Sequence, residues 1–111
     1  MKVDYTDNSQ QVLSALEKGK RNALTAIGAT AETYAKKATP VDTGRLRNSI
    51  SHSVDGEAAY IGSNVEYASY VELGTSRAKA HHMLQKAATE HSAEYKRLSE
   101  DAIYSAINNS Q

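Results

Sequence analysis

The sequence predicts an α+β fold with a long N-terminal helix, a short antiparallel sheet based on a β-hairpin, a short helical turn and a long C-terminal helix. Two long segments place apolar residues three or four positions apart, which is the spacing of one helical face. Between them, apolar and polar residues alternate on either side of an Asp-Gly pair, as in a half-buried hairpin. A chain of 111 residues is expected to form one domain. Its expected parts are an N-terminal arm, a helix, a hairpin and loop region, a helix and a frayed tail, at residues 1–8, 9–39, 40–80, 83–107 and 108–111.

The first helix is predicted by a single apolar stripe that contains one lysine. Gly19 and Gly28 lie inside this pattern at a propensity cost of roughly 1 kcal/mol each, so we expect another backbone to come close there. Pro40 ends the helix, because the residue before a proline is pushed out of the α region. The stripe consists of Leu13, Leu16, Lys20, Leu24, Ile27, Ala31, Tyr34 and Ala38.

A short helical turn and a hairpin are predicted next. Asp42 and Thr43 are good N-cap residues, and the turn is expected to run through Leu46. The pair Asp55-Gly56 predicts a two-residue hairpin turn, followed by a return strand over residues 57–62. The side chains expected to face inward are Ile50, His52 and Val54 on the first strand and Ala59 and Ile61 on the second.

The segment Tyr67–Thr75 fits either a helix or a strand. Tyr67, Tyr70, Val71 and Gly74 have helical spacing, whereas Val65, Tyr67, Val71 and Leu73 have strand spacing. We favour a helical turn with Gly74 as its C-cap. Residues 77–81 are polar and expected to be mobile. The last helix is predicted by a stripe through Met83, Leu84, Ala87, Ala88, His91, Tyr95, Leu98, Ala102 and Ala106.

The hairpin is expected to need additional partners, because two strands alone are marginally stable. Residues 1–5 or 75–80 could add a strand within the chain, or a neighbouring subunit could add one across an interface. This need is a physical argument for oligomerisation.

The composition predicts a thin core. The chain has no Phe, Trp or Cys and only two Met, and alanine is by far the commonest of its apolar residues. Alanine buries little area, so at about 25 cal/mol per Å² each buried alanine contributes little stability. Alanine-rich faces indicate close backbone approach, and a lone copy is expected to be only marginally stable.

The charge balance and the absence of cysteine exclude several classes of function. The formal net charge is zero and no basic stripe is present, which disfavours tight nucleic-acid binding. Without cysteine there is no disulfide framework, thiol catalysis or thiolate metal site. No apolar run approaches the roughly 20 residues of a membrane span, and the N-terminus lacks the apolar stretch of a secretory signal. The chain is therefore expected to be made in a cytoplasm and to stay there initially.

Residues 41–44 match the short Asp-Thr-Gly motif of aspartic proteases. That chemistry needs two such loops meeting in a dimer, so that two carboxylates share one proton on an almost wholly β scaffold. Here Asp42 follows a long helical pattern and Pro40, and Arg45 stands where a small residue is expected. We interpret the motif as a helix cap and turn, and we predict no catalytic residue and no cofactor.

The four histidines do not predict a metal site. His81 and His82 are adjacent, so their side chains point apart on a helix or a strand. His52 and His91 lie on inward faces and are better explained as partly buried histidines with hydrogen-bond partners.

Glu66 and Glu72 flank the short helical turn. An acid–base pair is conceivable, but we favour charge pairing with Arg45 or Arg47. A partly buried Glu72 carboxylate would need such a partner.

Tyrosine is the only aromatic residue, with seven copies. Tyrosine combines a buried ring with a hydroxyl that tolerates water, which suits interfaces. Tyr34 and Tyr95 are expected in the core, and Tyr67 and Tyr70 are expected equally in the core or at an interface.

The order of these segments resembles the tail-component family of tailed bacteriophages, typified by the tenth gene product of a lambdoid phage. The resemblance covers roughly residues 10–105 and is most specific at Pro40–Leu46 and Tyr67–Thr75. His82-Met83-Leu84 stands where the family usually has proline, an aromatic residue and leucine, so this loop is expected to be less rigid. The resemblance assigns a structural or interface motif to Pro40, Asp42, Thr43, Gly44, Arg45, Leu46, Tyr67, Tyr70, Glu72, Gly74 and Thr75.

The resemblance implies a non-enzymatic virion protein at the neck or the head-proximal end of the tail, which acts in tail completion or head–tail joining. The implied assembly is a ring, with six copies the expected number, around a channel through which DNA passes. Connector or head-completion proteins and tail tube or terminator proteins are the implied neighbours, with no membrane or small-molecule substrate. The alternatives from other classes are a dimeric aspartic protease that uses Asp42-Thr43-Gly44 and a small nucleic-acid-binding accessory protein.

Overall fold

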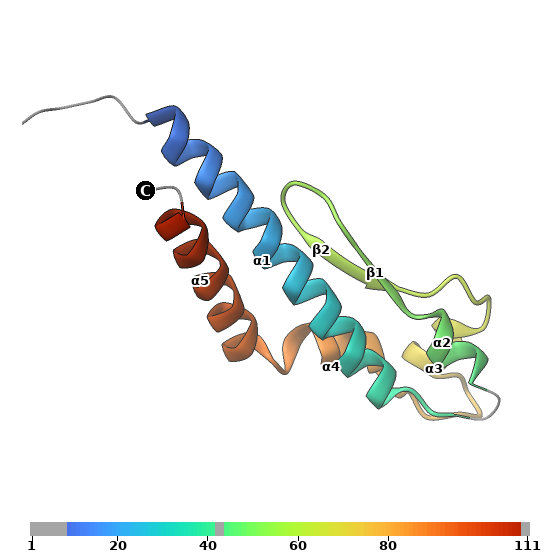
Figure 1. Cartoon of the computed structure of the whole chain (residues 1–111). Coiled ribbons are helices and arrows are strands. Elements are labelled where there is room, and N and C mark those ends of the chain that lie inside the picture. The colour runs from blue at the N-terminus through green and yellow to red at the C-terminus, as the bar shows by residue number, and fades with distance from the viewer. Residues whose placement is uncertain (1–8, 42–43, 110–111) are drawn as a thin grey trace, which may run out of the picture.

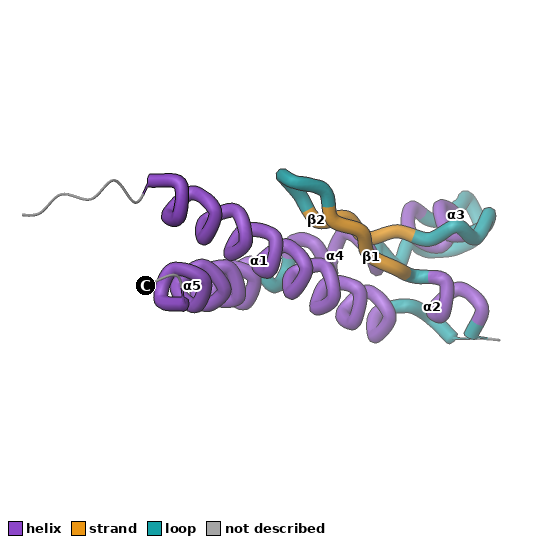
Figure 2. Tube along the Cα trace, turned by 45° about the horizontal axis from the view of Figure 1, so that its top comes forward, coloured by secondary structure: helices purple, strands orange, loops and turns teal. Residues whose placement is uncertain are grey.

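The computed structural model describes residues 9–41 and 44–109, and its central element is the long helix α1. In Figure 1, α5 runs along α1 toward its N-terminal end, α2 to α4 gather around its C-terminal end, and the hairpin lies beside its middle. Figure 2 shows the hairpin and α5 on different sides of α1. The elements are α1 (Ser9–Ala38), α2 (Arg45–Ser49), β1 (Ser51–Val54), β2 (Ala59–Gly62), α3 (Ala68–Leu73), α4 (Met83–Thr89) and α5 (Ser92–Asn109). This mixed α+β order confirms the predicted fold class.

The buried face of α1 consists of small residues, and it differs in part from the predicted stripe. A Cβ added to Gly19 would lie 3.0 Å from the Ile103 Cα of α5, so the two helices touch through their backbones there. Leu13 and Leu16 are 56% and 39% exposed, which contradicts their predicted place on the inward stripe. Helix α5 packs on the alanine and glycine side because the absence of large side chains there permits the closest approach. The alanines buried on α1 are Ala15, Ala23, Ala31 and Ala35.

Gly28 is the point at which α1 packs closely against the hairpin, just as Gly19 is the point at which it packs closely against α5. A Cβ at Gly28 would lie 2.8 Å from the His52 ring of β1. The His52 Nδ1 atom lies 3.1 Å from a carboxylate oxygen of Glu32 on α1. The predicted approach of another backbone is therefore confirmed at Gly19, whereas Gly28 makes room for the His52 side chain.

Strands β1 and β2 pair antiparallel, with Ser51 opposite Gly62 and Val54 opposite Ala59. The predicted faces are confirmed, because His52, Val54, Ala59 and Ile61 are half-buried while Ser51, Ser53 and Tyr60 are exposed.

The hairpin turn lies one residue later than predicted. The Asp55 N–H donates to the Ala58 carbonyl at 3.1 Å, so the two turn residues are Gly56 and Glu57. The Asp55 carboxylate accepts hydrogen bonds from the Glu57 and Ala58 N–H groups, each at 2.8 Å. This Asx-type turn explains why β2 begins at Ala59 instead of Glu57.

Within residues 9–41 and 44–109 the sheet contains these two strands alone. The prediction that residues 75–80 could add a strand is wrong. That segment turns back on itself, with the Thr75 N–H donating to the Ala78 carbonyl. The alternative partner, residues 1–5, lies outside the described residues.

The C-terminal helix is broken, which corrects the continuous helix predicted over residues 83–107. At the break, the His91 ring stacks on the Tyr34 ring with centroids 3.5 Å apart. The Tyr95 hydroxyl donates to the Ala87 carbonyl, and the Tyr34 hydroxyl donates to Glu94. Ala87 packs with Ala35 of α1, and His91 contacts Tyr34 of α1 and Tyr95 of α5, so the apolar period continues across the break and does not reveal it.

The core is as thin as the composition predicts. Seven of the eleven buried apolar residues that the structure describes are alanine. Ile50 and Met83 are the largest side chains that are fully buried. The remaining apolar members of the buried set are Leu46 and Val65. No helix among the described residues is long and apolar enough to cross a membrane.

Candidate functional site

The structure brings the two motif segments, Pro40–Leu46 and Tyr67–Thr75, together at the C-terminal end of α1. We call this part of the molecule the motif end. Between the segments lies an open groove of about 540 Å³, which we call the motif groove. Its lining residues are Pro40, Val41, Gly44, Arg45, Leu46, Tyr67 and Val71.

The first segment is organised by Gly44. Its φ of 84° lies in the left-handed region that favours glycine, and its carbonyl accepts the Asn48 N–H at 2.9 Å. Helix α2 therefore starts at Arg45 and ends at Ser49, beyond the predicted end at Leu46. Asp42 and Thr43 lie outside the described residues, so their capping role stays a prediction.

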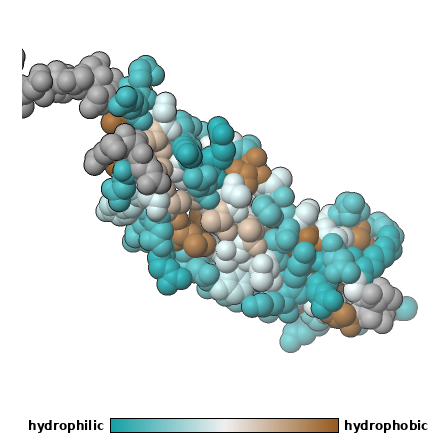
Figure 3. Space-filling view, viewed as in Figure 1, coloured by the Kyte–Doolittle hydropathy of each residue, from teal (hydrophilic) through white to brown (hydrophobic). Residues whose placement is uncertain are grey.

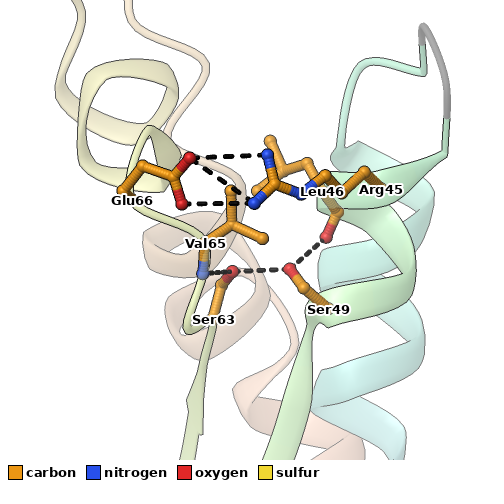
Figure 4. A network of polar contacts seen from close by, with 6 residues as sticks. All are labelled: Arg45, Leu46, Ser49, Ser63, Val65 and Glu66. Atoms are coloured by element: carbon orange, nitrogen blue, oxygen red, sulfur yellow. Dashed lines mark hydrogen bonds and ion pairs between the residues drawn. The ribbon is translucent and has the colours of Figure 1, made fainter.

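A network of polar contacts joins α2 to the residues directly before the second segment (Figure 4). The Arg45 guanidinium lies 3.3 Å and 3.4 Å from the two carboxylate oxygens of Glu66, which confirms the predicted pairing for Glu66. It also lies 5.5 Å from the centre of the Tyr67 ring, within range of a cation–π interaction. A hydrogen bond from the backbone N–H of Glu66 and, next, the charge of Arg45 lower the pKa of the Glu66 carboxyl.

Below this exposed pair, two serines connect α2 to the segment after β2. The Ser49 and Ser63 hydroxyl oxygens are 2.5 Å apart. Ser49 donates to the Leu46 carbonyl, and the Ser63 hydroxyl accepts the Val65 N–H at 3.1 Å. These contacts hold Leu46 and Val65 side by side in the core.

The second segment forms a helix, as favoured from the sequence. Helix α3 ends at Leu73, and its C-cap is Gly74, whose φ of 80° and ψ of 175° are accessible almost only to glycine. A Cβ at Gly74 would lie 2.7 Å from the Ala80 nitrogen. The Thr75 hydroxyl accepts the N–H groups of Arg77 and Ala78, so the chain turns tightly directly after α3.

Glu72 binds the start of α4, which corrects its predicted pairing with an arginine. Its carboxylate oxygens accept the Leu84 N–H at 2.7 Å and the Gln85 N–H at 3.0 Å. The first N–H groups of a helix need acceptors from outside the helix. His82, which precedes α4, makes no side-chain capping bond. The Glu72 side chain, on α3, therefore caps the N-terminus of α4. The backbone carbonyl of Glu72 also accepts the His82 N–H.

A cluster of buried apolar side chains supports the groove from below. It combines Leu46, Val65, Ala68 and Met83, against which Tyr67, Val71 and Leu84 pack. Thr39 is buried beside it and donates to the Ala35 carbonyl at 2.6 Å, with Met83 Sδ at 3.3 Å. Sequence reasoning did not identify Thr39, Ser49 or Ser63, because each acts through a contact with a residue distant in the chain.

Large apolar side chains are exposed at the motif end, which Figure 3 shows as brown patches among hydrophilic residues. Leu73, Tyr70 and Val41 are 71%, 62% and 55% exposed. Tyr67 is half-buried against the core cluster, so the two tyrosines whose location was open divide between core and surface.

Basic residues flank the groove on the side of α1. Lys36, Lys37 and Arg47 line a neighbouring depression that shares Val41 with the groove. Lys36 pairs with Glu32 at 3.3 Å. The hydrogen bond from His52 is the main cause that lowers the pKa of the Glu32 carboxyl, and Lys36 lowers it further.

The arrangement does not fit the catalytic alternatives. The two strands of the described residues do not form the largely β scaffold that an aspartic protease requires. Glu66 pairs with Arg45 while Glu72 caps α4, so they do not form an acid–base pair. Among the described residues, no three His, Asp or Glu side chains are grouped so that they could hold a metal ion.

A protein-family model described as "Bacteriophage HK97-gp10, putative tail-component" matches residues 6–74. The matched part contains α1, the hairpin, the whole of α2 and α3, and all groove-lining residues. No curated protein and no solved structure gives a significant match.

Proposed function

We propose that this chain, which belongs to the HK97-gp10-like family of bacteriophage tail components, acts in tail completion or in joining the tail to the head. It does so as one subunit of an oligomeric ring at the neck or at the head-proximal end of the tail. The family match carries this proposal, because it spans the first motif segment, the second as far as Gly74, and the groove between them.

The packing of the chain supports a role in an assembly. A core made mostly of alanine yields little burial energy per residue. Large apolar side chains remain exposed at both ends of α1, with Val12 and Leu13 at one end and Val41 at the other. Neighbouring subunits would cover this surface, and a subunit with different surfaces at its two ends suits a ring.

The proposed neighbours are other copies of the chain, a connector or head-completion protein on the head side, and a tail tube or terminator protein on the tail side. DNA would pass through the ring without being held tightly, in keeping with a formal net charge of zero. We propose a non-enzymatic role, since Arg45 in the groove and the polar groups around it, on Ser49, Ser63 and Glu72, are engaged in structural contacts.

Deletion of the gene from the phage or prophage that carries it tests the proposal. We expect DNA-filled heads and separate tails under the electron microscope, with joining restored by the wild-type gene. An antibody against the restored protein should label the head–tail junction. Normal infectious particles after deletion, or label at the distal tip of the tail, would contradict the proposed role.

A further inference from the structure

The groove of the motif end and the outer face of α5 lie at opposite ends of the molecule (Figure 1). The last turns of α5 pack beside the N-terminal half of α1, where Gly19 meets Ile103 and Ala106. The groove lies beyond the C-terminal end of α1, beside Pro40. A contact between these two surfaces therefore cannot form within one copy.

The groove combines an apolar lining with a basic rim. Leu46, Tyr67 and Val71 supply apolar surface inside it, and Val41 is exposed at its edge. Lys37 and Arg47 lie near Val41. Neither makes an ion pair within the part of the chain that the structure describes. A fitting ligand would carry an apolar or aromatic anchor beside carboxylates.

Tyr104 on α5 has these properties. Its side chain is 67% exposed, and Glu100 and Asp101 precede it by one helical turn. Within the described residues, neither carboxylate takes part in a hydrogen bond or an ion pair. Tyrosine is also a residue that commonly anchors protein interfaces.

The other exposed apolar residues fit this groove less well. Val12, Leu13 and Leu16 on α1 are followed within three turns by Lys18, Lys20 and Arg21, with Glu17 as the single carboxylate among residues 9–21, so a basic rim would on balance repel this segment. Tyr60 lies close to Asp55 and Glu57, but these carboxylates are already engaged. Asp55 accepts two backbone N–H groups, and Glu57 pairs with Lys20 at 3.0 Å.

We propose that Tyr104 of one copy enters the motif groove of the next copy, with its Glu100 and Asp101 against Lys37 and Arg47. This inference rests on the proposed ring. The contact joins different surfaces of identical chains, so it repeats from copy to copy and closes where the rotation between neighbours permits.

Disulfide trapping tests the contact, and the natural absence of cysteine removes any background. A chain with both Val41→Cys and Tyr104→Cys should form a ladder of cross-linked multimers on mild oxidation. Each single variant alone should form none, and an equal mixture of the two should form only dimers. The matched control is Val41→Cys with Tyr60→Cys, which pairs the groove with a tyrosine that is 54% exposed, and it should give no ladder.

Charge reversal provides a second test that does not depend on cysteine reactivity. Glu100→Lys with Asp101→Lys should weaken self-association on the order of tenfold or more, and Lys37→Glu with Arg47→Glu in the same chain should restore it. Efficient dimers from Tyr104→Cys alone, or equal ladders from the Tyr60 control, would overturn the proposed contact. A charge reversal that leaves self-association unchanged would also overturn the proposed contact. An oligomer of the expected mass without the 41–104 cross-link would overturn the contact and leave the ring standing, whereas a wild type that never associates would overturn both.

Discussion

The two halves of the molecule are held together in opposite ways. Along the first half of α1, small residues let α5 come so close that a Cβ at Gly19 would contact the Ile103 backbone. At the motif end, a few larger side chains fill the core, above all Leu46 and Met83, and specific polar contacts join the elements. The helix pair therefore tolerates additions poorly, while the motif end depends on individual contacts that are lost when one group is removed.

The same difference explains where the family resemblance is most specific. Gly44, Gly74 and Glu72 have backbone or capping roles that other residues fill poorly. Their order in the sequence is therefore distinctive. The α1–α5 contact needs only small residues at a helical spacing, which many helices have.

The largest expected effect is that of Gly74→Ala at the motif end. The added Cβ would lie 2.7 Å from the Ala80 nitrogen, and φ is 80°. We expect a loss of about 4 kcal/mol in the free energy of unfolding, from backbone strain and overlap together. Urea denaturation measures it. The control is Gly62→Ala, where a Cβ meets no atom within 4 Å; similar losses for both variants would refute the special role of Gly74.

Glu72→Gln separates the capping contact from ordinary surface charge. The variant loses the charge and one of two acceptors for the α4 N–H groups. We expect a loss of about 1 to 2 kcal/mol by thermal or urea unfolding. Glu66→Gln is the matched control because its pair with Arg45 is exposed to solvent, and it should change stability little. If the Glu66 variant is the more damaging one, the network of Figure 4 and not the cap holds the motif end together.

Gly19→Ala probes the helix pair by adding one methyl group. The new Cβ would lie 3.0 Å from the Ile103 Cα and 3.1 Å from the Ala106 Cβ, so α5 must shift by a few tenths of an ångström to accommodate it. Overlap costs more than the helix propensity that alanine gains, and we expect a net loss of about 1 kcal/mol. Thr25→Ala, on the exposed side of α1, serves as the control. A stabilised Gly19→Ala protein would show that the close approach of the two backbones does not limit the stability of the α1–α5 pair.

The smallest effect is a pH dependence at the contact between α1 and the hairpin. His52 lowers the pKa of Glu32 below its ordinary value of 4.5. Ionised Glu32 therefore stabilises the fold above about pH 4.5, and this contribution is lost as the pH falls through the lowered pKa. Glu32→Gln should reduce the slope of stability against pH between about pH 5 and pH 3. His52→Ala should reduce it similarly, and an unchanged slope in both variants would rule out the coupling.

The sequence was sufficient for the fold class and for most elements, because helical and alternating patterns reflect burial directly. The pairing of Glu66 with Arg45 also followed from charge and position. The exposure of Leu13 and Leu16 could not be predicted from the sequence. Helix α5 packs on the alanine face of α1, where the backbones can come close, and this leaves the larger leucines exposed. The break between α4 and α5 was hidden because the apolar period continues across it.

The candidate site was predictable as two segments but not as one groove. Glu72 was identified as a carboxylate in need of a partner, yet the partner is the start of a helix twelve residues later. Backbone donors at a helix start carry no residue signature, so sequence reasoning chose an arginine instead. Thr39 and Ser63 were missed for the same reason, because their hydroxyl groups matter only through the folded contacts.

We infer that this chain completes its burial by associating with other copies. Native mass spectrometry of the purified protein, over a range of concentrations, measures this most directly. We expect one closed oligomer of fixed copy number, with six copies, that dissociates when the motif end is disrupted by Gly74→Ala. A stable monomer at every concentration, unfolding as cooperatively as a self-contained domain, would contradict it.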